Sequence, residues 1–154
     1  MSEKSRLLKA NADLYAYPLA VLELERRDWT SLRCGCGRDA AHVRDAVASL
    51  LAGGGDGSGL VDHLGGGDAG LAPPAAPVAA VLVNALSDGA EGGVLDDIAF
   101  VLLYLADAVR GAGAVSPEGA AFLRVLNEGY YTVRAMGAGA YAEEAETILG
   151  LLPG

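Results

Sequence analysis

The chain has 154 residues, of which 52% are hydrophobic and only 6% aromatic. This composition excludes a disordered chain and predicts one domain with its own core, built mostly from Leu, Val and Ala. The formal net charge of −9 argues against a nucleic-acid-binding protein, because phosphate contacts need Lys and Arg side chains. Residues 1–44 carry eight basic and six acidic side chains, whereas residues 45–154 carry three basic and fourteen acidic ones. The acidic surface favours solubility and attracts a basic protein partner.

No segment has the pattern of a signal peptide or of a membrane span. The N-terminus is charged, and Asp96, Asp97 and Asp107 interrupt the apolar segment from Val94 to Val109. We therefore expect a soluble, cytoplasmic protein without a membrane partner. Arg outnumbers Lys nine to two, which together with abundant Ala and Gly is typical of a bacterial genome rich in G and C.

In the first half of the chain the apolar residues recur with helical spacing, and no alternating strand pattern appears. Pro18 is expected at the start of a helix, Asp28 or Thr30 at the cap of a short turn through Trp29, and Asp39 at the N-cap of a further helix. A brief helical turn is expected from Leu60 to Leu64. The helices predicted in this half cover residues 3–14, 18–27 and 40–52.

In the second half, Pro74 or Pro77 is expected to open a helix through the run "VAAVLVNAL". Ser116 followed by Pro117 is a helix start, because the serine side chain satisfies a free backbone N–H group and proline presets the helical φ angle. The later helices are predicted over residues 93–110, 117–136 and 141–152. Glycine-rich stretches near residues 53–59 and 65–72 are expected to be flexible connectors within a single domain, residues 1–154.

A set of short motifs occurs in a specific order between residues 28 and 110. It consists of a tryptophan and a leucine, a glycine-ended turn before a helix, a histidine–glycine turn, an Ala-Pro helix and the leucine-rich run "IAFVLLYLADA". The residues that carry it are Trp29, Leu32, Gly37, His63, Gly65, Ala72, Pro73 and Pro77. This order resembles the small bacterial HEAT-like helical-repeat domains.

The resemblance implies an all-α, HEAT-like stack or bundle of about six to seven helices that binds another macromolecule. Such domains serve as interaction modules or, in some settings, as immunity-type proteins, and they are not usually catalytic. The chain departs from the family where a glycine-rich run replaces the polar and aromatic residues that usually follow the histidine–glycine turn. The cysteines and residues 111–154 lie outside the resemblance.

Both cysteines of the chain lie close together, in "SLRCGCGRDAAH". Cys34, Cys36 and His42 offer three soft metal ligands, and His63 offers a fourth. Structural zinc sites usually have two to four residues between paired cysteines, so a single intervening glycine is strained for a metal site. We therefore expect no metal and no cofactor, and an ordinary loop ahead of a helix, with Cys36 as a reactive thiol at most.

Acidic and tyrosyl side chains supply the remaining chemistry. If the helices over residues 93–110 and 117–136 pack antiparallel, Asp97, Tyr104, Glu128 and Tyr131 line one groove, although Asp96 and Asp107 are expected as exposed carboxylates at its rim. Tyrosine is enriched at protein interfaces because it is rigid, apolar and able to hydrogen-bond. The predicted binding residues are Asp96, Asp97, Tyr104, Asp107, Glu128, Tyr130 and Tyr131.

These patterns predict a cytoplasmic protein-binding module, serving as an inhibitor, an immunity-type protein or an accessory protein. Two alternatives stay open: a small-molecule enzyme or ligand-binding protein that uses the acidic-tyrosyl groove, and a thiol or metal protein. An enzyme would need a carboxylate or tyrosine with a perturbed pKa in a closed cleft. An open surface would favour the interaction module.

Overall fold

The computed structural model describes residues 16–54, 57–66, 70–112 and 115–153. Within these ranges the chain forms eight α-helices and two short helical turns, and its only extended pairings are two isolated β-bridges. The prediction of an all-α fold is therefore confirmed. The helix predicted over residues 3–14 lies outside the described residues.

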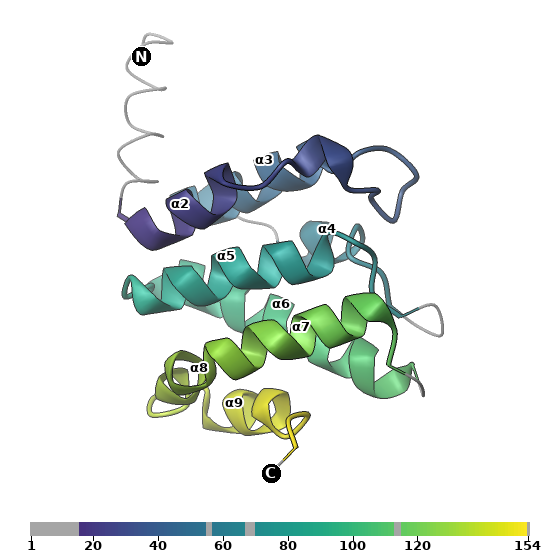
Figure 1. The fold of residues 1–154 in the computed structure, drawn as a ribbon. Coiled ribbons are helices and arrows are strands. Elements are labelled where there is room, and N and C mark those ends of the chain that lie inside the picture. The colour runs from purple at the N-terminus through teal and green to yellow at the C-terminus, as the bar shows by residue number, and fades with distance from the viewer. Residues whose placement is uncertain (1–15, 55–56, 67–69, 113–114, 154) are drawn as a thin grey trace, which may run out of the picture.

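The helices lie in two layers (Figure 1). One layer stacks α2 (Pro18–Glu25), α5 (Ala75–Ser87) and α7 (Pro117–Glu128), with α8 (Tyr130–Met136) continuing from α7. The layer behind it contains α3 (Ala41–Ser49), α4 (Gly57–Val61), α6 (Gly92–Gly111) and α9 (Ala142–Leu149). Helix α5 lies between α2 and α7 and packs against both, so it occupies the centre of its layer.

The core fills the space between the two layers. Helix α5 buries ten of its thirteen residues, and Phe122 of α7 and Leu102 of α6 are fully buried. No polar or charged residue is buried within the described ranges. This agrees with a core made of Leu, Val and Ala, in which small side chains let neighbouring helices approach closely.

Two local start signals act as predicted. The Ser116 hydroxyl accepts a hydrogen bond from the Gly119 backbone N–H at 3.0 Å, and Pro117 is the first residue of α7. Asp28 caps the 3-10 turn Trp29–Ser31 by accepting from the Thr30 N–H at 3.1 Å. The prediction of Asp39 as an N-cap is wrong by one residue, because Ala40 holds the N-cap position of α3, although the Asp39 carboxylate accepts from the Ala41 N–H at 3.0 Å. Each signal needs only its own neighbours in sequence.

The helical turn predicted from Leu60 to Leu64 lies earlier, as α4, and the helix predicted over residues 141–152 ends at Leu149. Two further predicted helices are interrupted near a glycine. The predicted helix over residues 40–52 ends as α3 at Ser49 and passes into a π-helical turn, Leu50–Gly54, because Gly53 adopts a φ of +85°. The predicted helix over residues 117–136 is interrupted at Gly129 and forms α7 and α8 instead. A Cβ placed on Gly129 would lie 2.5 Å from Cγ1 of Val83, so the close approach of α5 accounts for a glycine at this junction.

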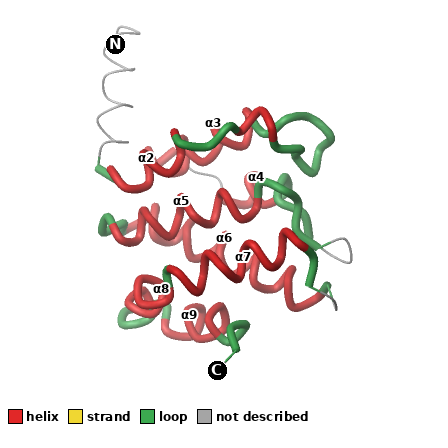
Figure 2. Tube along the Cα trace, in the orientation of Figure 1, coloured by secondary structure: helices red, strands yellow, loops and turns green. Residues whose placement is uncertain are grey.

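The loops that follow the 3-10 turn and α4 lie on the same edge of the stack (Figure 2). Tyr104 of α6 connects to the loop after α4, because its hydroxyl donates a 2.9 Å hydrogen bond to the Gly65 carbonyl. None of the described helices combines the length and the apolar character that crossing a membrane requires.

Candidate functional site

A groove runs along α5 between α2 and α7. One half of it, about 440 Å³, extends from Pro73 and Pro117 toward the middle of the layer, and the other half, about 330 Å³, continues to Ser87 and Thr132. Both halves share Arg26, Arg27, Val125 and Glu128, so they are neighbouring parts of one surface. We call this surface the α5 groove.

Small side chains form the floor of the α5 groove, and charged side chains form its rims. Ala76 and Ala80 lie on α5, where they leave room for another chain to approach the helix. Arg26 and Arg27 directly follow α2, and Arg124 lies on α7 one turn before Glu128. An apolar floor with charged rims is the usual composition of a surface that binds a peptide segment.

The charged side chains on the two rims differ in whether they form ion pairs. On α2, Glu23 makes ion pairs of 3.0 Å with Arg26 and 3.2 Å with Arg27. On α7, Arg124 and Glu128 are exposed, and neither takes part in an ion pair with another described residue. The α7 rim therefore presents both a cation and an anion that a bound chain can engage.

A pair of tyrosines, Tyr130 and Tyr131, lies at the start of α8. Tyr131 is 83% exposed and packs edge-to-face on Tyr130, with ring centroids 5.3 Å apart. Its neighbour Thr132 lines the groove, as does Glu128 one turn earlier. Of the predicted binding residues, Tyr130 and Tyr131 therefore contact each other, and Glu128 lines the α5 groove nearby in sequence.

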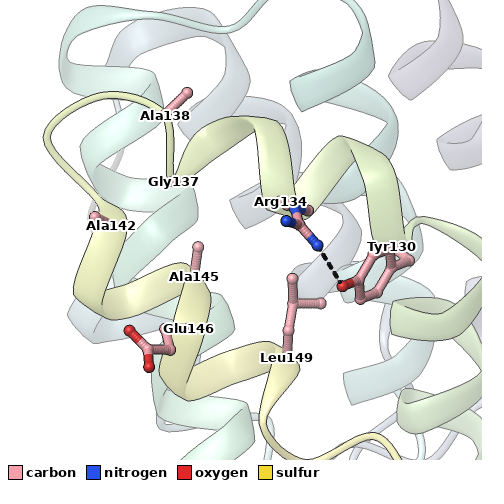
Figure 3. Close-up of a pocket in the computed structure, with 8 residues that line it drawn as sticks. All are labelled: Tyr130, Arg134, Gly137, Ala138, Ala142, Ala145, Glu146 and Leu149. Atoms are coloured by element: carbon pink, nitrogen blue, oxygen red, sulfur yellow. Dashed lines mark hydrogen bonds between the residues drawn. The ribbon is translucent and has the colours of Figure 1, made fainter. Parts of the chain in front are cut away.

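A second pocket, of about 460 Å³, lies between α8 and α9 (Figure 3). The Arg134 guanidinium donates a 2.9 Å hydrogen bond to the Tyr130 hydroxyl and lies over the Tyr130 ring. The remaining lining residues are mostly small or apolar, with Ala145 and Leu149 facing Arg134 across the pocket and the Glu146 carboxylate turned away from it. This pocket holds one predicted binding residue, Tyr130, and none of the predicted carboxylates.

The other predicted binding residues lie on α6, in the other layer. Asp96 is exposed, and Asp107 is exposed and makes a 3.0 Å ion pair with Arg110, as expected for carboxylates at a rim. Asp97 is half-buried beside α4, where a Cβ on Gly57 would lie 3.5 Å from its Oδ1 atom. Tyr104 is half-buried, and its hydroxyl serves the hydrogen bond to Gly65 described above.

The single groove expected from antiparallel packing of the helices over residues 93–110 and 117–136 does not form. Helix α7 packs mainly against α5, whereas α6 packs mainly against α4 and α9. No pocket found among the described residues is lined both by a predicted binding residue of α6 and by one of α7 or α8. The reason is that α5 takes the place beside α7, which separates the tyrosine pair from the aspartates of α6.

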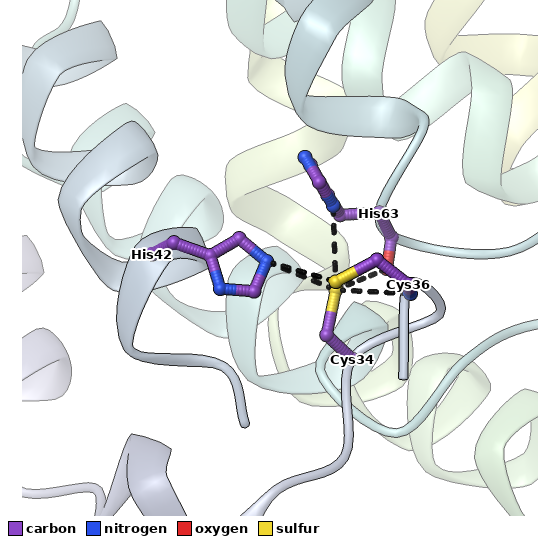
Figure 4. A group of neighbouring side chains, drawn as sticks. All are labelled: Cys34, Cys36, His42 and His63. Atoms are coloured by element: carbon purple, nitrogen blue, oxygen red, sulfur yellow. Dashed lines mark hydrogen bonds between the residues drawn. The ribbon is translucent and has the colours of Figure 1, made fainter. Parts of the chain in front are cut away.

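The structure also brings together both cysteines and both histidines of the chain (Figure 4). Cys34 and Cys36 lie in the loop before α3, His42 is the second residue of α3, and His63 follows α4. One Sγ or ring nitrogen atom from each residue lies within 4.8 Å of the corresponding atoms of the other three. Cys34 is 2% exposed, Cys36 is exposed, and the two histidines are half-buried. We call these four residues the Cys/His cluster.

The two thiols of this cluster differ in acidity. Hydrogen bonds from the Arg38 backbone and side chain lower the pKa of Cys36 from 9.0 to about 6, which makes it largely a thiolate at neutral pH. Burial raises the pKa of Cys34. The lowered pKa of Cys36 agrees with the sequence-based expectation of a reactive thiol, although the donor is Arg38 and not the α3 N-terminus.

The sequence predicted part of the Cys/His cluster and little of the α5 groove. The cysteines and His42 were evident from their spacing, but the contact between Cys34 and His63 spans 29 positions and depends on how α4 packs against α3. Of the α5 groove the sequence predicted only Glu128, because the two rims lie far apart in sequence, at the end of α2 and on α7. A basic pair at a helix end, Arg26 and Arg27, was its only local signal.

Comparison of the chain with protein-family models, with curated proteins and with solved structures gives no match.

Proposed function

We propose that this chain is a cytoplasmic protein-binding module with a HEAT-like stack of helices, acting as an inhibitor, an immunity-type protein or an accessory protein. The α5 groove supports the proposal, together with the exposed Tyr131 side chain, which follows the groove in sequence next to Thr132. The thirteen residues of α5 correspond to a groove of about 20 Å, at about 1.5 Å per residue. That length accommodates about six residues of an extended partner segment, at about 3.3 Å each.

The chemistry of the groove favours a partner segment with both apolar and charged side chains. The floor at Ala76 and Ala80 suits an apolar side chain or a close backbone, and Tyr131 supplies a rigid aromatic contact. The net charge of −9 favours a basic partner, because the long-range field steers oppositely charged proteins together. Glu128, the exposed carboxylate that lines both halves of the groove, is the one that such a partner is expected to contact.

The test starts with native purification of the chain from its own cells, followed by mass spectrometry of any stoichiometric protein. Affinity is then measured by calorimetry with the purified partner. Loss of an exposed tyrosine or reversal of a rim charge typically weakens an interface severalfold or more, so Tyr131→Ala and Glu128→Lys are each expected to weaken binding about tenfold. Phe100→Ala is the matched control, because Phe100 is an exposed aromatic residue on α6, 46% exposed, outside the groove.

The outcome with Asp97→Lys separates the two predicted surfaces. Unchanged affinity in this variant, with loss in Tyr131→Ala, assigns binding to the α5 groove. Loss in Asp97→Lys with normal binding by Tyr131→Ala would move the interface to α6 and overturn the groove assignment. Copurification of no stoichiometric protein under any condition would contradict the module itself.

A small-molecule ligand is the second candidate, and the pocket between α8 and α9 favours it. Arg134 presents a guanidinium beside the Tyr130 hydroxyl above an apolar floor, which suits a small carboxylate with an aliphatic body. The pocket lacks the paired acid and base that catalysis by the predicted residues would need. Saturable binding of such carboxylates, lost in Arg134→Gln, would favour this candidate over the interaction module.

A further inference from the structure

The Cys/His cluster has the dimensions of a tetrahedral metal site. His42 Nε2 lies 3.2 Å from Cys34 Sγ and 3.4 Å from Cys36 Sγ, and His63 Nδ1 lies 3.4 Å from Cys34 Sγ. Zinc bonds of about 2.3 Å to sulfur and about 2.0–2.1 Å to nitrogen place a sulfur and a nitrogen ligand about 3.5–3.6 Å apart at tetrahedral corners. The three sulfur–nitrogen separations are about 0.1–0.4 Å shorter than that. All four ligand atoms lie within 4.8 Å of one another.

Ordinary hydrogen bonding does not account for this arrangement. A single imidazole nitrogen, His42 Nε2, faces both sulfur atoms, yet it carries at most one proton and can donate to only one of them at a time. The two imidazole rings approach the sulfurs from different sides, with ring centroids 4.8 Å apart and nearly perpendicular (Figure 4). One cation at the centre satisfies all four side chains at once.

Backbone hydrogen bonds hold the two cysteines in one tight turn, residues 34–38, which we call the knuckle. The Cys34 N–H donates to the Arg38 carbonyl at 2.8 Å, the Gly37 N–H donates to the Cys34 carbonyl at 3.0 Å, and Gly37 adopts a φ of +93° that favours glycine. The Cys36 N–H points at Cys34 Sγ from 3.5 Å, which stabilises a thiolate there. The cysteine spacing of one residue is therefore compatible with a shared metal, because this turn folds the sulfurs toward each other.

Gly35, between the cysteines, brings the knuckle against His63. Its N–H donates to the His63 carbonyl at 3.3 Å, and a Cβ at this position would lie 3.2 Å from the same oxygen. Any larger residue would push the knuckle away from His63. Gly35 makes the spacing between Cys34 and Cys36 short, and the same glycine allows His63 to lie close to both cysteines.

We propose that Cys34, Cys36, His42 and His63 bind one Zn²⁺ ion that cross-links the loop before α3 to the end of α4. Two thiolates and two neutral imidazoles leave the centre without net charge, which suits a site that is partly buried. Two sulfur and two nitrogen ligands in tetrahedral arrangement select Zn²⁺ over the harder Mg²⁺ and Ca²⁺ ions. Four protein ligands leave no coordination position for a substrate, so the centre is structural and separate from the partner-binding function.

The ion would secure the least regular part of the stack. In the part of the chain that the structure describes, the loop before α3 and the segment after α4 contain one isolated β-bridge each, Arg33 with Asp39 and Gly65 with Leu71. Leu32 and Pro73, which adjoin these segments, line one end of the α5 groove. Metal binding is therefore expected to order this end of the groove without contributing a ligand to the partner.

The test uses the full chain, purified under reducing conditions, with zinc measured by elemental mass spectrometry and Co²⁺ binding measured by absorption. We expect one zinc per chain. Replacement by Co²⁺ is expected to produce sulfur-to-cobalt charge-transfer bands and the visible bands of tetrahedral coordination. Zinc removal by a chelator is expected to lower the Tm, and re-addition of zinc alone is expected to restore it.

The variants Cys36→Ala and His63→Gln are expected to weaken zinc binding at least a hundredfold. Cys36 is exposed, so its replacement leaves the core intact, and circular dichroism checks that the helices persist. Asp62→Asn is the matched control, because Asp62 is an exposed carboxylate beside His63 that is not in the cluster. Folded protein that binds neither Zn²⁺ nor Co²⁺ would overturn the proposal, as would zinc affinity that is unchanged in Cys36→Ala or lost in Asp62→Asn.

Discussion

The Asp88 carboxylate caps the start of α2 from the far end of α5. Its Oδ2 atom accepts a hydrogen bond from the Ala20 N–H at 3.0 Å, and its Oδ1 atom accepts one from the Leu19 N–H at 3.2 Å. The residue at the N-cap position of α2, Tyr17, makes no side-chain cap. A carboxylate 68 residues later in the chain therefore satisfies the free N–H groups of α2 and ties this helix to α5.

Replacement of Asp88 should destabilise the fold by the cost of a lost cap. Asp88→Ala is expected to lower the free energy of unfolding by about 1–2 kcal/mol, because two N–H groups lose their acceptor. Asp88→Asn keeps an oxygen acceptor and is expected to cost less. Urea denaturation followed by circular dichroism measures both, and equal stability of Asp88→Ala and wild type would rule out the capping role.

Gly129 tests why α7 and α8 are separate helices. Gly129→Ala is expected to cost about 1–3 kcal/mol, because its Cβ would lie 2.5 Å from Cγ1 of Val83 and would force α5 and α7 apart. Gly139→Ala is the matched control, since nothing lies within 4 Å of a Cβ there, and its effect is expected within about 0.5 kcal/mol.

A double-mutant cycle separates this clash from a simple helix-propensity effect. In the Val83→Ala background the Cγ1 atom is gone, so Gly129→Ala is expected to cost much less than in wild type. The same cost in both backgrounds would show that the junction owes its glycine to something other than contact with Val83. Thermal or urea unfolding of the four proteins provides the measurement.

The acidity of Cys36 predicts a pH dependence of alkylation in the metal-free, reduced chain. Because hydrogen bonds with Arg38 lower the pKa of Cys36 to about 6, the thiolate persists at neutral pH. The rate of reaction with iodoacetamide should therefore be nearly constant above pH 7 and fall as the pH drops through about 6. Cys34, whose pKa is raised by burial, is expected to react more slowly at every pH.

Peptide mass spectrometry after timed alkylation gives the rate for each cysteine separately. Arg38→Ala removes only the side-chain donor and keeps the backbone hydrogen bond, so the midpoint for Cys36 is expected to move part of the way back toward 9.0. A midpoint near 9.0 in the wild-type chain would contradict this account of the loop. Added zinc is expected to suppress the reaction of both cysteines, since metal-bound thiolates are shielded from the reagent.

Local chemistry determined those features that a few neighbouring residues can specify. Ser116 and Pro117 start α7, Asp28 caps the turn at Trp29, and the apolar spacing predicts helices with no strand. These signals act through hydrogen bonds and dihedral angles within one turn of helix, so they can be predicted from neighbouring residues alone.

Only the tertiary structure decided the features that join distant segments. The break at Gly129 depends on Val83 of α5, the cap of α2 depends on Asp88, and the tyrosine pair is separated from the α6 aspartates because α5 occupies the place beside α7. His63 joins Cys34 for the same reason, since α4 must first pack against α6 and α3. Helical periodicity says which face of each helix is apolar, but the choice of neighbour is made by the packing of all faces together.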